Sequence, residues 1–340
     1  MYVTLYGTGE IARYPTNSNN NAPELIKLAP TVKAMALSPD GGRLLVTRFI
    51  SPENWGEVFD IDASSWQLDR TFRLDKHLVE DSLNDGRGKP NYLAAVIING
   101  SNDRAYVVGK KDNTDRGPLN TSLDPDLDLH LDLDPDNSVR TIVMTLDLEN
   151  NQELRDQRID LDNTSSLSAL AMNSDSQTLF IAEQGRNAVR ALQIGADLRF
   201  TGQISSLPTG LAPQGFCFDN DRDTLFVKNF TDRSVTSIDI SNGISSSIIQ
   251  NTSTVDNETL STSELRGLQL FYNAFEGLTN SQPVGTVSAE GYISCASCHI
   301  DGGHDGNTWD FTGRGEGLRC LLYTSPSPRD QRGSRMPSSA

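Results

Sequence analysis

The sequence predicts a mainly β protein built from repeated four-stranded units and followed by a small helical domain. Three observations support this prediction. Residues 1–250 repeat one pattern of short apolar strands separated by polar turns. Residues 251–260 form a polar linker rich in Asn, Thr and Ser. Beyond this linker, the spacing of apolar residues changes from that of a strand to that of a helix.

Each repeated unit begins with an apolar strand, a polar turn and a second strand of β-branched and aromatic residues. A third strand ends in an Ile/Leu-Asp pair, and a fourth strand closes the unit. The strands of four complete units are expected at residues 32–37, 44–47, 56–62 and 67–74; 92–98, 105–108, 139–147 and 153–159; 167–172, 179–182, 187–194 and 200–204; and 214–218, 225–227, 234–240 and 244–249.

Four-stranded units with a period in the forties are typical of propeller blades. Because side chains alternate along a strand, one face of each sheet lies against its neighbour, and a single blade cannot bury its core alone. A β-sandwich, the rival all-β architecture, would not predict the same four-strand pattern four times. The sequence therefore favours a partial β-propeller of about four and a half blades over residues 1–250.

The first 14 residues resemble the second and third strands of a YVTN-type propeller repeat, with Tyr2-Val3-Thr4 at the signature. Leu45-Val46-Thr47 and Phe180-Ile181-Ala182 occupy the equivalent place in later units, although their letters depart from it. The resemblance implies that the chain starts inside a blade. We therefore expect further sequence, including a signal peptide, to precede Met1.

Two insertions interrupt the units. Residues 77–90 are polar and are expected to form a surface loop. Residues 110–138 contain alternating Asp residues between positions 124 and 136, which could line one face of a strand as a Ca²⁺ surface. This stretch lacks the Gly of an EF-hand-like turn, so a solvated insertion is favoured and Ca²⁺ binding is left open. Cys217, between Phe216 and Phe218, is predicted to be a small buried apolar residue.

A helix is predicted after the linker, because Ser261 and Glu264 have the spacing of a capping box. Apolar residues follow at helical spacing, namely Leu265, Leu268, Phe271, Tyr272 and Phe275. Gly267 and Phe271, one turn apart, resemble the N-terminal helix of a class I cytochrome c.

The segment Cys295-Ala296-Ser297-Cys298-His299 has the spacing of covalent c-type haem attachment. The two thiols would add to the vinyl groups of the porphyrin, and the adjacent imidazole would bind the iron as proximal ligand. A structural zinc site would need four ligands, and only His304 lies nearby as an additional one. A Cys-X-X-Cys redox pair would require a βαβ background, which the surrounding sequence lacks. The sequence therefore predicts haem c on Cys295 and Cys298, with His299 as the metal ligand.

Residues 291–319 resemble the haem-binding portion of di-haem cytochrome c peroxidase relatives. That resemblance implies a small α-helical, cytochrome c-like domain over residues 261–319, truncated at its C-terminal side. In those relatives the stretch commonly continues into a segment carrying Asn-Thr-Pro, which this chain lacks. The sixth iron ligand is left open, because the only Met after His299 is Met336 and His304 is too close in sequence.

Residues 320–340 differ in composition from the rest of the chain, changing abruptly to Ser, Pro and Arg. They resemble a translated transposon sequencing adapter followed by a flow-cell primer. We interpret them as a non-native tail and exclude them from the fold.

The formal net charge of −16 disfavours nucleic acids and anionic membranes as partners. No apolar run approaches the roughly 18 residues of a membrane span, so none is expected. The start of the chain also lacks the features of a signal peptide. Because haem c is attached outside the cytoplasm, we expect a periplasmic or extracellular protein whose signal peptide lies in the missing N-terminal sequence.

These observations predict an extracytoplasmic c-type haem protein in electron transfer, with the propeller as a docking or covering platform. The expected partner is a redox protein or a small-molecule oxidant. One alternative is a di-haem peroxidase-like oxidoreductase with a second haem motif beyond the truncation, so whether the protein is an enzyme stays open. Another alternative is a propeller scaffold for binding or surface structure. The sequence assigns no catalytic residue, and it leaves the oligomeric state unknown.

Overall fold

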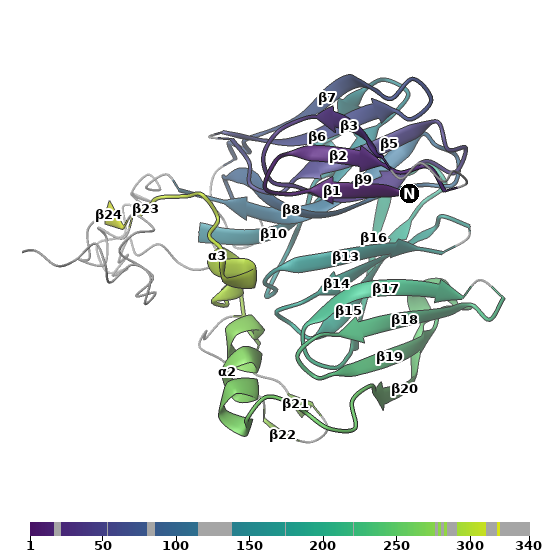
Figure 1. Ribbon diagram of the computed structural model, residues 1–340. Coiled ribbons are helices and arrows are strands. Elements are labelled where there is room, and N and C mark those ends of the chain that lie inside the picture. The colour runs from purple at the N-terminus through teal and green to yellow at the C-terminus, as the bar shows by residue number, and fades with distance from the viewer. Residues whose placement is uncertain are drawn as a thin grey trace, which may run out of the picture.

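The computed structural model describes residues 1–16, 22–52, 54–79, 86–114, 138–173, 175–219, 221–275, 278–279, 282–283, 291–310 and 318–319. These residues form a mainly β structure with five antiparallel sheets and few helices. The sheets follow one another in chain order (Figure 1). Within each sheet the strands also lie in chain order, except that the last strand of the third sheet pairs with the strand two places before it.

The first sheet contains β1 (Tyr2–Leu5), β2 (Glu10–Arg13) and β3 (Glu24–Lys27). The second contains β4 (Val32–Leu37), β5 (Arg43–Arg48), β6 (Trp55–Asp62) and β7 (Gln67–Asp75). The third contains β8 (Lys89–Ile98), β9 (Arg104–Asp112), β10 (Val139–Asp147), β11 (Gln152–Glu153) and β12 (Ile159–Leu161). The fourth contains β13 (Leu167–Met172), β14 (Thr178–Glu183), β15 (Ala188–Ile194) and β16 (Phe200–Pro208). The fifth contains β17 (Pro213–Asp219), β18 (Thr224–Asn229), β19 (Ser234–Asp239) and β20 (Ser247–Ser253).

The remaining elements are short. The helices are α2 (Thr262–Tyr272) and α3 (Ala296–His299), with single 3₁₀ turns at Arg155–Gln157, Gly243–Ser245 and Ile300–Gly302. Two small hairpins pair β21 (Leu278–Thr279) with β22 (Gln282–Pro283), and β23 (Trp309–Asp310) with β24 (Leu318–Arg319). Within the described chain, no helix is long and apolar enough to cross a membrane.

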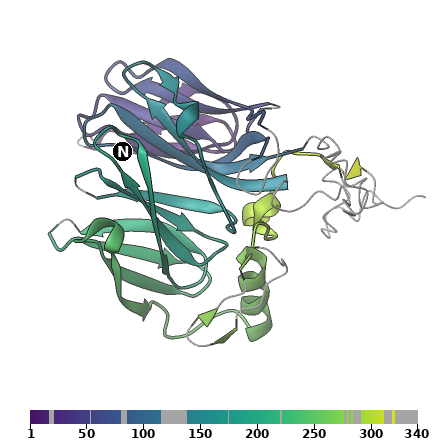
Figure 2. The ribbon, with the colours of Figure 1, turned by 180° about the vertical axis from the view of Figure 1, so that it is seen from behind.

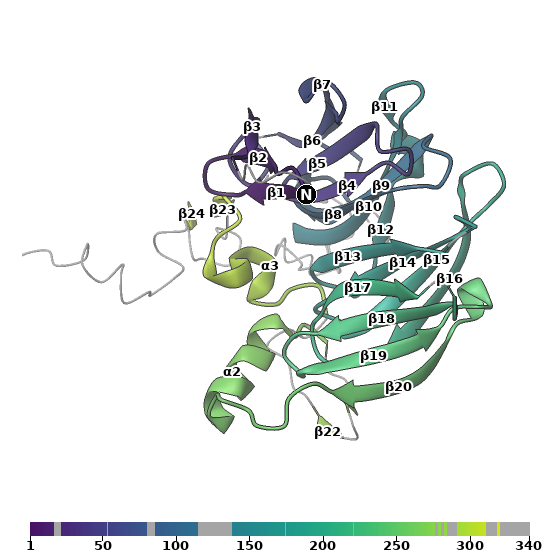
Figure 3. The same cartoon turned by 45° about the vertical axis from the view of Figure 1, so that its right-hand side comes forward.

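The five sheets are arranged along an arc, because the first strand of each sheet contacts the first strand of the next. The contacting strands are β1, β4, β8, β13 and β17 in that order (Figure 3). The hydrophobic core is divided accordingly into four clusters, one between each pair of neighbouring sheets. This arrangement is compatible with a partial β-propeller.

Successive side chains of a strand point to opposite faces of its sheet, and in the inner sheets both of these faces are buried. In β9, Ala105 and Val107 pack toward the second sheet, whereas Tyr106 and Val108 pack toward the fourth. In β14, Leu179 and Ile181 likewise face the third sheet. These strands are therefore apolar on both sides, as expected for sheets stacked face to face.

Most of the predicted strands are found within a few residues of their expected positions. Two differences are instructive. The first sheet has a third strand, β3, that was not predicted. The fourth strand expected at 153–159 is interrupted by the 3₁₀ turn Arg155–Gln157 and continues as β12, which pairs with β10. The helix α2 begins as predicted, with a capping box between Ser261 and Glu264.

The insertions are shorter than predicted, because their ends belong to strands. Lys89 and Pro90 open β8 and are buried, so the proposed loop at 77–90 ends earlier. Lys110–Asp112 similarly form the buried end of β9. The Asp-rich stretch at 124–136, and with it the Ca²⁺ prediction, lies outside the described residues.

One further expectation is corrected. Cys217 is exposed, because Phe216 and Phe218 pack toward the fourth sheet and the intervening residue points to the opposite face. After residue 260, α2 and the single turn α3 are the only α-helices among the described residues. A helical cytochrome c-like domain over residues 261–319 is not evident in them and stays a prediction. Residues 320–340 lie outside the described part of the chain.

Ile142, in β10 at the centre of the third sheet, has an exposed fraction of 0%. We predict that Ile142→Ala lowers the free energy of unfolding by about 2–5 kcal/mol, because it leaves a cavity in a core shared by two sheets. Ile249→Ala in β20, where the side chain is 56% exposed, is the matched control and should change it by less than about 0.5 kcal/mol. Urea denaturation measures both values, and equal losses in the two variants would contradict the stacked-sheet core.

Candidate functional site

The cysteine and histidine side chains of the 295–299 motif lie on one helical turn. Cys295 occupies the N-cap position of α3 in a right-handed helical conformation. The backbone N–H of His299 donates to the carbonyl of Cys295 at 2.9 Å, which closes the turn. Cys295, Cys298 and His299 therefore lie on one turn of the backbone, although among the described residues their side chains do not form a three-member metal-binding cluster.

His299 is held through one of its two ring nitrogens. Its Nδ1 lies 3.0 Å from the carbonyl oxygen of Gly303. A carbonyl can only accept, so this contact selects the tautomer in which Nδ1 carries the proton and Nε2 keeps its lone pair. Metal-binding histidines are commonly oriented in this way. His304 is engaged differently, because its Nδ1 accepts the backbone N–H of Gly306 at 3.1 Å.

The two motif thiols have different surroundings. Cys295 is exposed, whereas Cys298 is only partly accessible. Burial raises the pKa of the Cys298 thiol to about 12, although the charge of Lys110 acts in the opposite direction. A thiol with this pKa remains protonated near neutral pH, which does not favour thiolate chemistry. Among the described residues, no group of three or more His, Cys, Asp or Glu side chains is placed to hold a metal ion.

The described residues between 262 and 310, which include the motif and are called the motif segment below, lie against one end of the β-sheets. Figures 1 and 2 show α2 and α3 along the same side of the arc, seen from opposite directions. On the second sheet, Lys33 forms a long ion pair with Asp301, with 3.9 Å between Nζ and Oδ2. Tyr272 at the end of α2 also donates its hydroxyl to Asp301 at 2.9 Å.

The same segment is bonded to the fourth sheet. The backbone N–H of Ala274 donates to the carbonyl of Gly185 at 2.9 Å, and Asn187 donates its side-chain amide to Asn273 at 2.7 Å. The hydroxyl of Ser165, just before β13, lies 2.9 Å from that of Ser297 in α3. The fifth sheet adds an apolar contact, in which Phe230 meets the ring of Tyr272 edge to face. The second, fourth and fifth sheets therefore all contact this segment.

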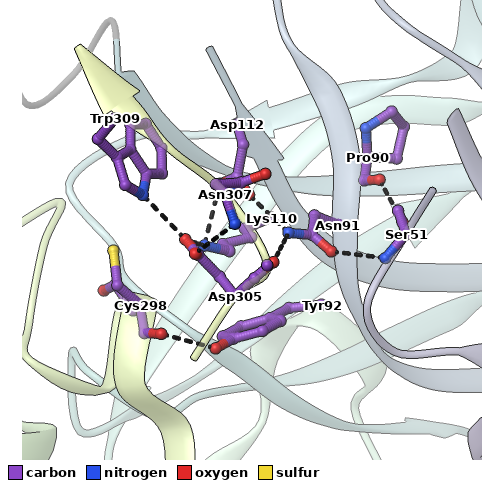
Figure 4. A network of polar contacts seen from close by, with 12 residues as sticks. Ser51, Pro90, Asn91, Tyr92, Lys110, Asp112, Cys298, Asp305, Asn307 and Trp309 are labelled. Atoms are coloured by element: carbon purple, nitrogen blue, oxygen red, sulfur yellow. Dashed lines mark hydrogen bonds and ion pairs between the residues drawn. The ribbon is translucent and has the colours of Figure 1, made fainter. Parts of the chain in front are cut away.

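The third sheet supplies a buried ion pair (Figure 4). Nζ of Lys110, in β9, lies 2.9 Å from Oδ2 of Asp305 and 3.1 Å from Oδ1 of Asp112. Lys110 is 3% exposed, and both carboxylates are fully buried. Burial alone would lower the pKa of Lys110, but the two carboxylates outweigh it and raise that pKa above its usual value. Lys110 also holds the pKa of Asp305 below its usual range, against the effect of burial.

The second carboxylate of this cluster is accommodated by hydrogen-bond donors. Burial raises the pKa of Asp112, yet its Oδ2 accepts from Asn91 at 2.8 Å and from Asn307 at 2.5 Å. Asn91 also donates to the backbone carbonyl of Asp305 at 3.0 Å, and Trp309 donates its indole N–H to Asp305 at 3.1 Å. These contacts satisfy charged groups that would otherwise be costly to bury.

Tyr92, in β8, contacts the motif directly. Its hydroxyl donates to the backbone carbonyl of Cys298 at 2.8 Å (Figure 4). Its ring stacks on Phe49 with 4.3 Å between centroids, and Lys110 Nζ lies 4.4 Å from the ring centroid. Burial raises the pKa of Tyr92 above its usual value, so the hydroxyl remains a donor.

Tyr92, Lys110 and Asp305 are not predicted as site residues from the sequence. Lys110 falls at the start of the predicted insertion 110–138, although it belongs to β9. A detectable signal existed in the run Lys110-Lys111-Asp112, which continues the strand pattern of β9 without a turn residue. The pairing of Lys110 with a residue 195 positions later could not be inferred from spacing.

Comparison with known proteins places only the fold. No family model matches the chain, and no curated protein does. Among solved structures, hydrazine synthase of Kuenenia stuttgartiensis is similar at a TM-score of 0.54 and 15% identity, over 71% of this chain and 68% of that one. A functionally unknown protein from Desulfotomaculum acetoxidans DSM 771 has a TM-score of 0.51 and 16% identity, over 75% and 66%.

A protein from Lactobacillus plantarum has a TM-score of 0.50 and 11% identity, over 74% of this chain and 64% of that protein. The chain therefore spans about two thirds of the length of each of these neighbours. At these identities the likeness concerns the fold alone, and it agrees with a β-rich arrangement of several sheets.

A substitution at Gly185 tests the contact between the fourth sheet and the motif segment. A Cβ at this position would lie 2.7 Å from the backbone oxygen of Ser165, whereas a Cβ at Gly215 would meet nothing within 4 Å. We predict that Gly185→Ala costs about 1–3 kcal/mol of stability through overpacking. It should also speed amide exchange in residues 291–299, because the added Cβ would displace Ser165, whose hydroxyl is bonded to Ser297. Gly215→Ala should do neither, and equal behaviour of the two variants would contradict the contact.

Proposed function

We propose that this protein is an extracytoplasmic c-type haem protein that transfers electrons. The observation that supports this most strongly is the placement of Cys295, Cys298 and His299 on one helical turn, with Nδ1 of His299 held by the Gly303 carbonyl. Covalent haem requires two thiols and one imidazole in this order and spacing. A bound haem would cycle between Fe(III) and Fe(II) and so carry one electron.

The residues present fit such a group in their chemistry. Cys295 is exposed and Cys298 is partly accessible, so both sulfurs are candidates for thioether bonds. Nε2 of His299 would be the iron-binding atom, because Nδ1 is engaged with the backbone. Contacts with the second to fifth sheets would orient the motif and limit its exposure to water on one side. The iron needs only one protein ligand on this side, so a cluster of several metal-binding side chains is not required.

We also propose a more specific assignment of the observed fold. The five sheets would belong to a β-propeller of YVTN type, and the segment from residue 261 onward would be part of a cytochrome c-like domain. The propeller would act as a platform that covers the haem segment and receives the redox partner. The acidic chain, with a net charge of −16, would favour a partner with a basic surface.

Expression with a cytochrome maturation system tests this proposal. We predict a coloured protein with haem that survives denaturation, and loss of this haem in the double variant Cys295→Ala/Cys298→Ala. Cys217→Ala is the matched control, because this exposed thiol in β17 lies outside the motif, and it should retain full haem content. A colourless wild-type protein, or equal haem loss in the control, would refute the proposal.

Replacing His299 distinguishes the attachment of haem to the two cysteines from the binding of its iron by the histidine. We predict that His299→Ala, made in the same maturation system, changes the absorption spectrum and midpoint potential of any haem that is attached, because the iron loses its proximal ligand. His304→Ala should leave both unchanged, since His304 is bonded to the backbone N–H of Gly306. Optical redox titration measures both quantities. Identical spectra in wild type and His299→Ala would show that His299 is not the ligand.

A further inference from the structure

We propose that the third β-sheet sets the orientation of His299, with Tyr92 as a positioning residue supported by the Lys110–Asp305 ion pair. This inference rests on the proposed haem function. It goes beyond that function by assigning control of the haem potential to residues of the sheets, more than 180 positions before the motif.

The peptide bond between Cys298 and His299 is held at both of its polar atoms. Its N–H donates to the carbonyl of Cys295 at 2.9 Å, and its carbonyl accepts the hydroxyl of Tyr92 at 2.8 Å. Because a peptide unit is planar, fixing its N–H and C=O fixes its orientation. The direction in which the backbone enters His299 therefore depends on Tyr92.

The imidazole itself is held by a second contact that leads to the same sheet. Nδ1 of His299 is bonded to the carbonyl of Gly303, two residues before Asp305. Asp305 is tied to β9 by Lys110 at 2.9 Å and to β8 by Asn91, which donates to its backbone carbonyl at 3.0 Å. The loop from His299 to Asp305 is thus fixed at its far end by the third sheet.

Tyr92 lies at an irregularity that also occurs at the start of the second, fourth and fifth sheets, where Thr31, Ser166 and Ala212 likewise have a positive φ. Its φ is +46°, in the left-handed region that bulky residues rarely adopt. The register between β8 and β9 also shifts between Asn91 and Ala95. This backbone conformation is therefore a feature of the repeated sheets, and it places Tyr92 at a defined point at the start of β8. Here the stacking on Phe49, the proximity of Lys110 and the bond to Cys298 fix it together.

The variant Tyr92→Phe removes only the hydroxyl and retains the stacked ring. In the haem-loaded full chain we expect the equilibrium between the oxidised and reduced haem to change by about threefold to tenfold, and tenfold corresponds to 59 mV for one electron. The absorption bands of the haem should shift as well. Tyr106→Phe is the matched control, because Tyr106 is a 1% exposed tyrosine of β9 that contacts Phe200 at the neighbouring sheet. Its potential should equal that of the wild type.

Asp305→Asn tests the supporting ion pair in a second way. Lys110 keeps Asp112 as a partner at 3.1 Å, so this variant retains a buried ion pair and a side chain of nearly the same volume. It removes one negative charge from the loop that bears His299. Since a negative charge favours the more positive ferric state, we expect the midpoint potential to rise.

The outcomes separate this inference from the proposed function. A haem-loaded Tyr92→Phe protein with wild-type potential and spectrum would overturn the positioning role alone. A shift of equal size in Tyr106→Phe would do the same, because it would indicate a general effect of the sheet. A wild-type protein that attaches no haem would overturn the proposed function and this inference with it. A shift in Tyr92→Phe and a rise in Asp305→Asn, with an unchanged Tyr106→Phe, would support the assignment.

Discussion

The buried contact between Lys110 and Asp305 is the interaction on which the arrangement of the candidate site depends. It joins a strand of the third sheet to the loop that follows the Cys-X-X-Cys-His motif, across 195 positions of sequence. Removing Lys110 would leave the two buried carboxylates of Asp112 and Asp305 without a counter-charge, so this cluster tolerates little displacement. The donors from Asn91, Asn307 and Trp309 further restrict it to one geometry. A segment that could have been a mobile appendage is thereby a fixed part of the sheet assembly.

The stacked sheets provide the rigidity that this contact requires. Four hydrophobic clusters lie between successive sheets, so each inner sheet is packed on both faces. The residues that reach the motif segment come from the second, third, fourth and fifth sheets, and they include Lys33, Lys110, Asn187 and Phe230. Because the sheets are held together by their shared core, their contacts with the segment reinforce one another.

Local sequence patterns were sufficient to predict much of the fold. Alternating apolar residues located the strands, and Ser261 with Glu264 located the start of α2, because these features depend on neighbours within a few positions. Cys295, Cys298 and His299 could also be selected from spacing alone. The strand β3 was missed, since its four residues show little periodicity and the stretch that contains them is bounded by Pro23 and Pro30. The exposure of Cys217 and the pairing of Lys110 with Asp305 were not predicted, because both depend on which elements meet in space.

We propose that the thiols of Cys295 and Cys298 carry a covalently bound haem. The most direct test is mass spectrometry of the proteolytic peptide that contains both residues, prepared from protein made in a host with cytochrome maturation. We predict one porphyrin attached through both sulfurs, so that neither thiol can be alkylated. An unmodified peptide in which both thiols react with an alkylating agent would contradict it.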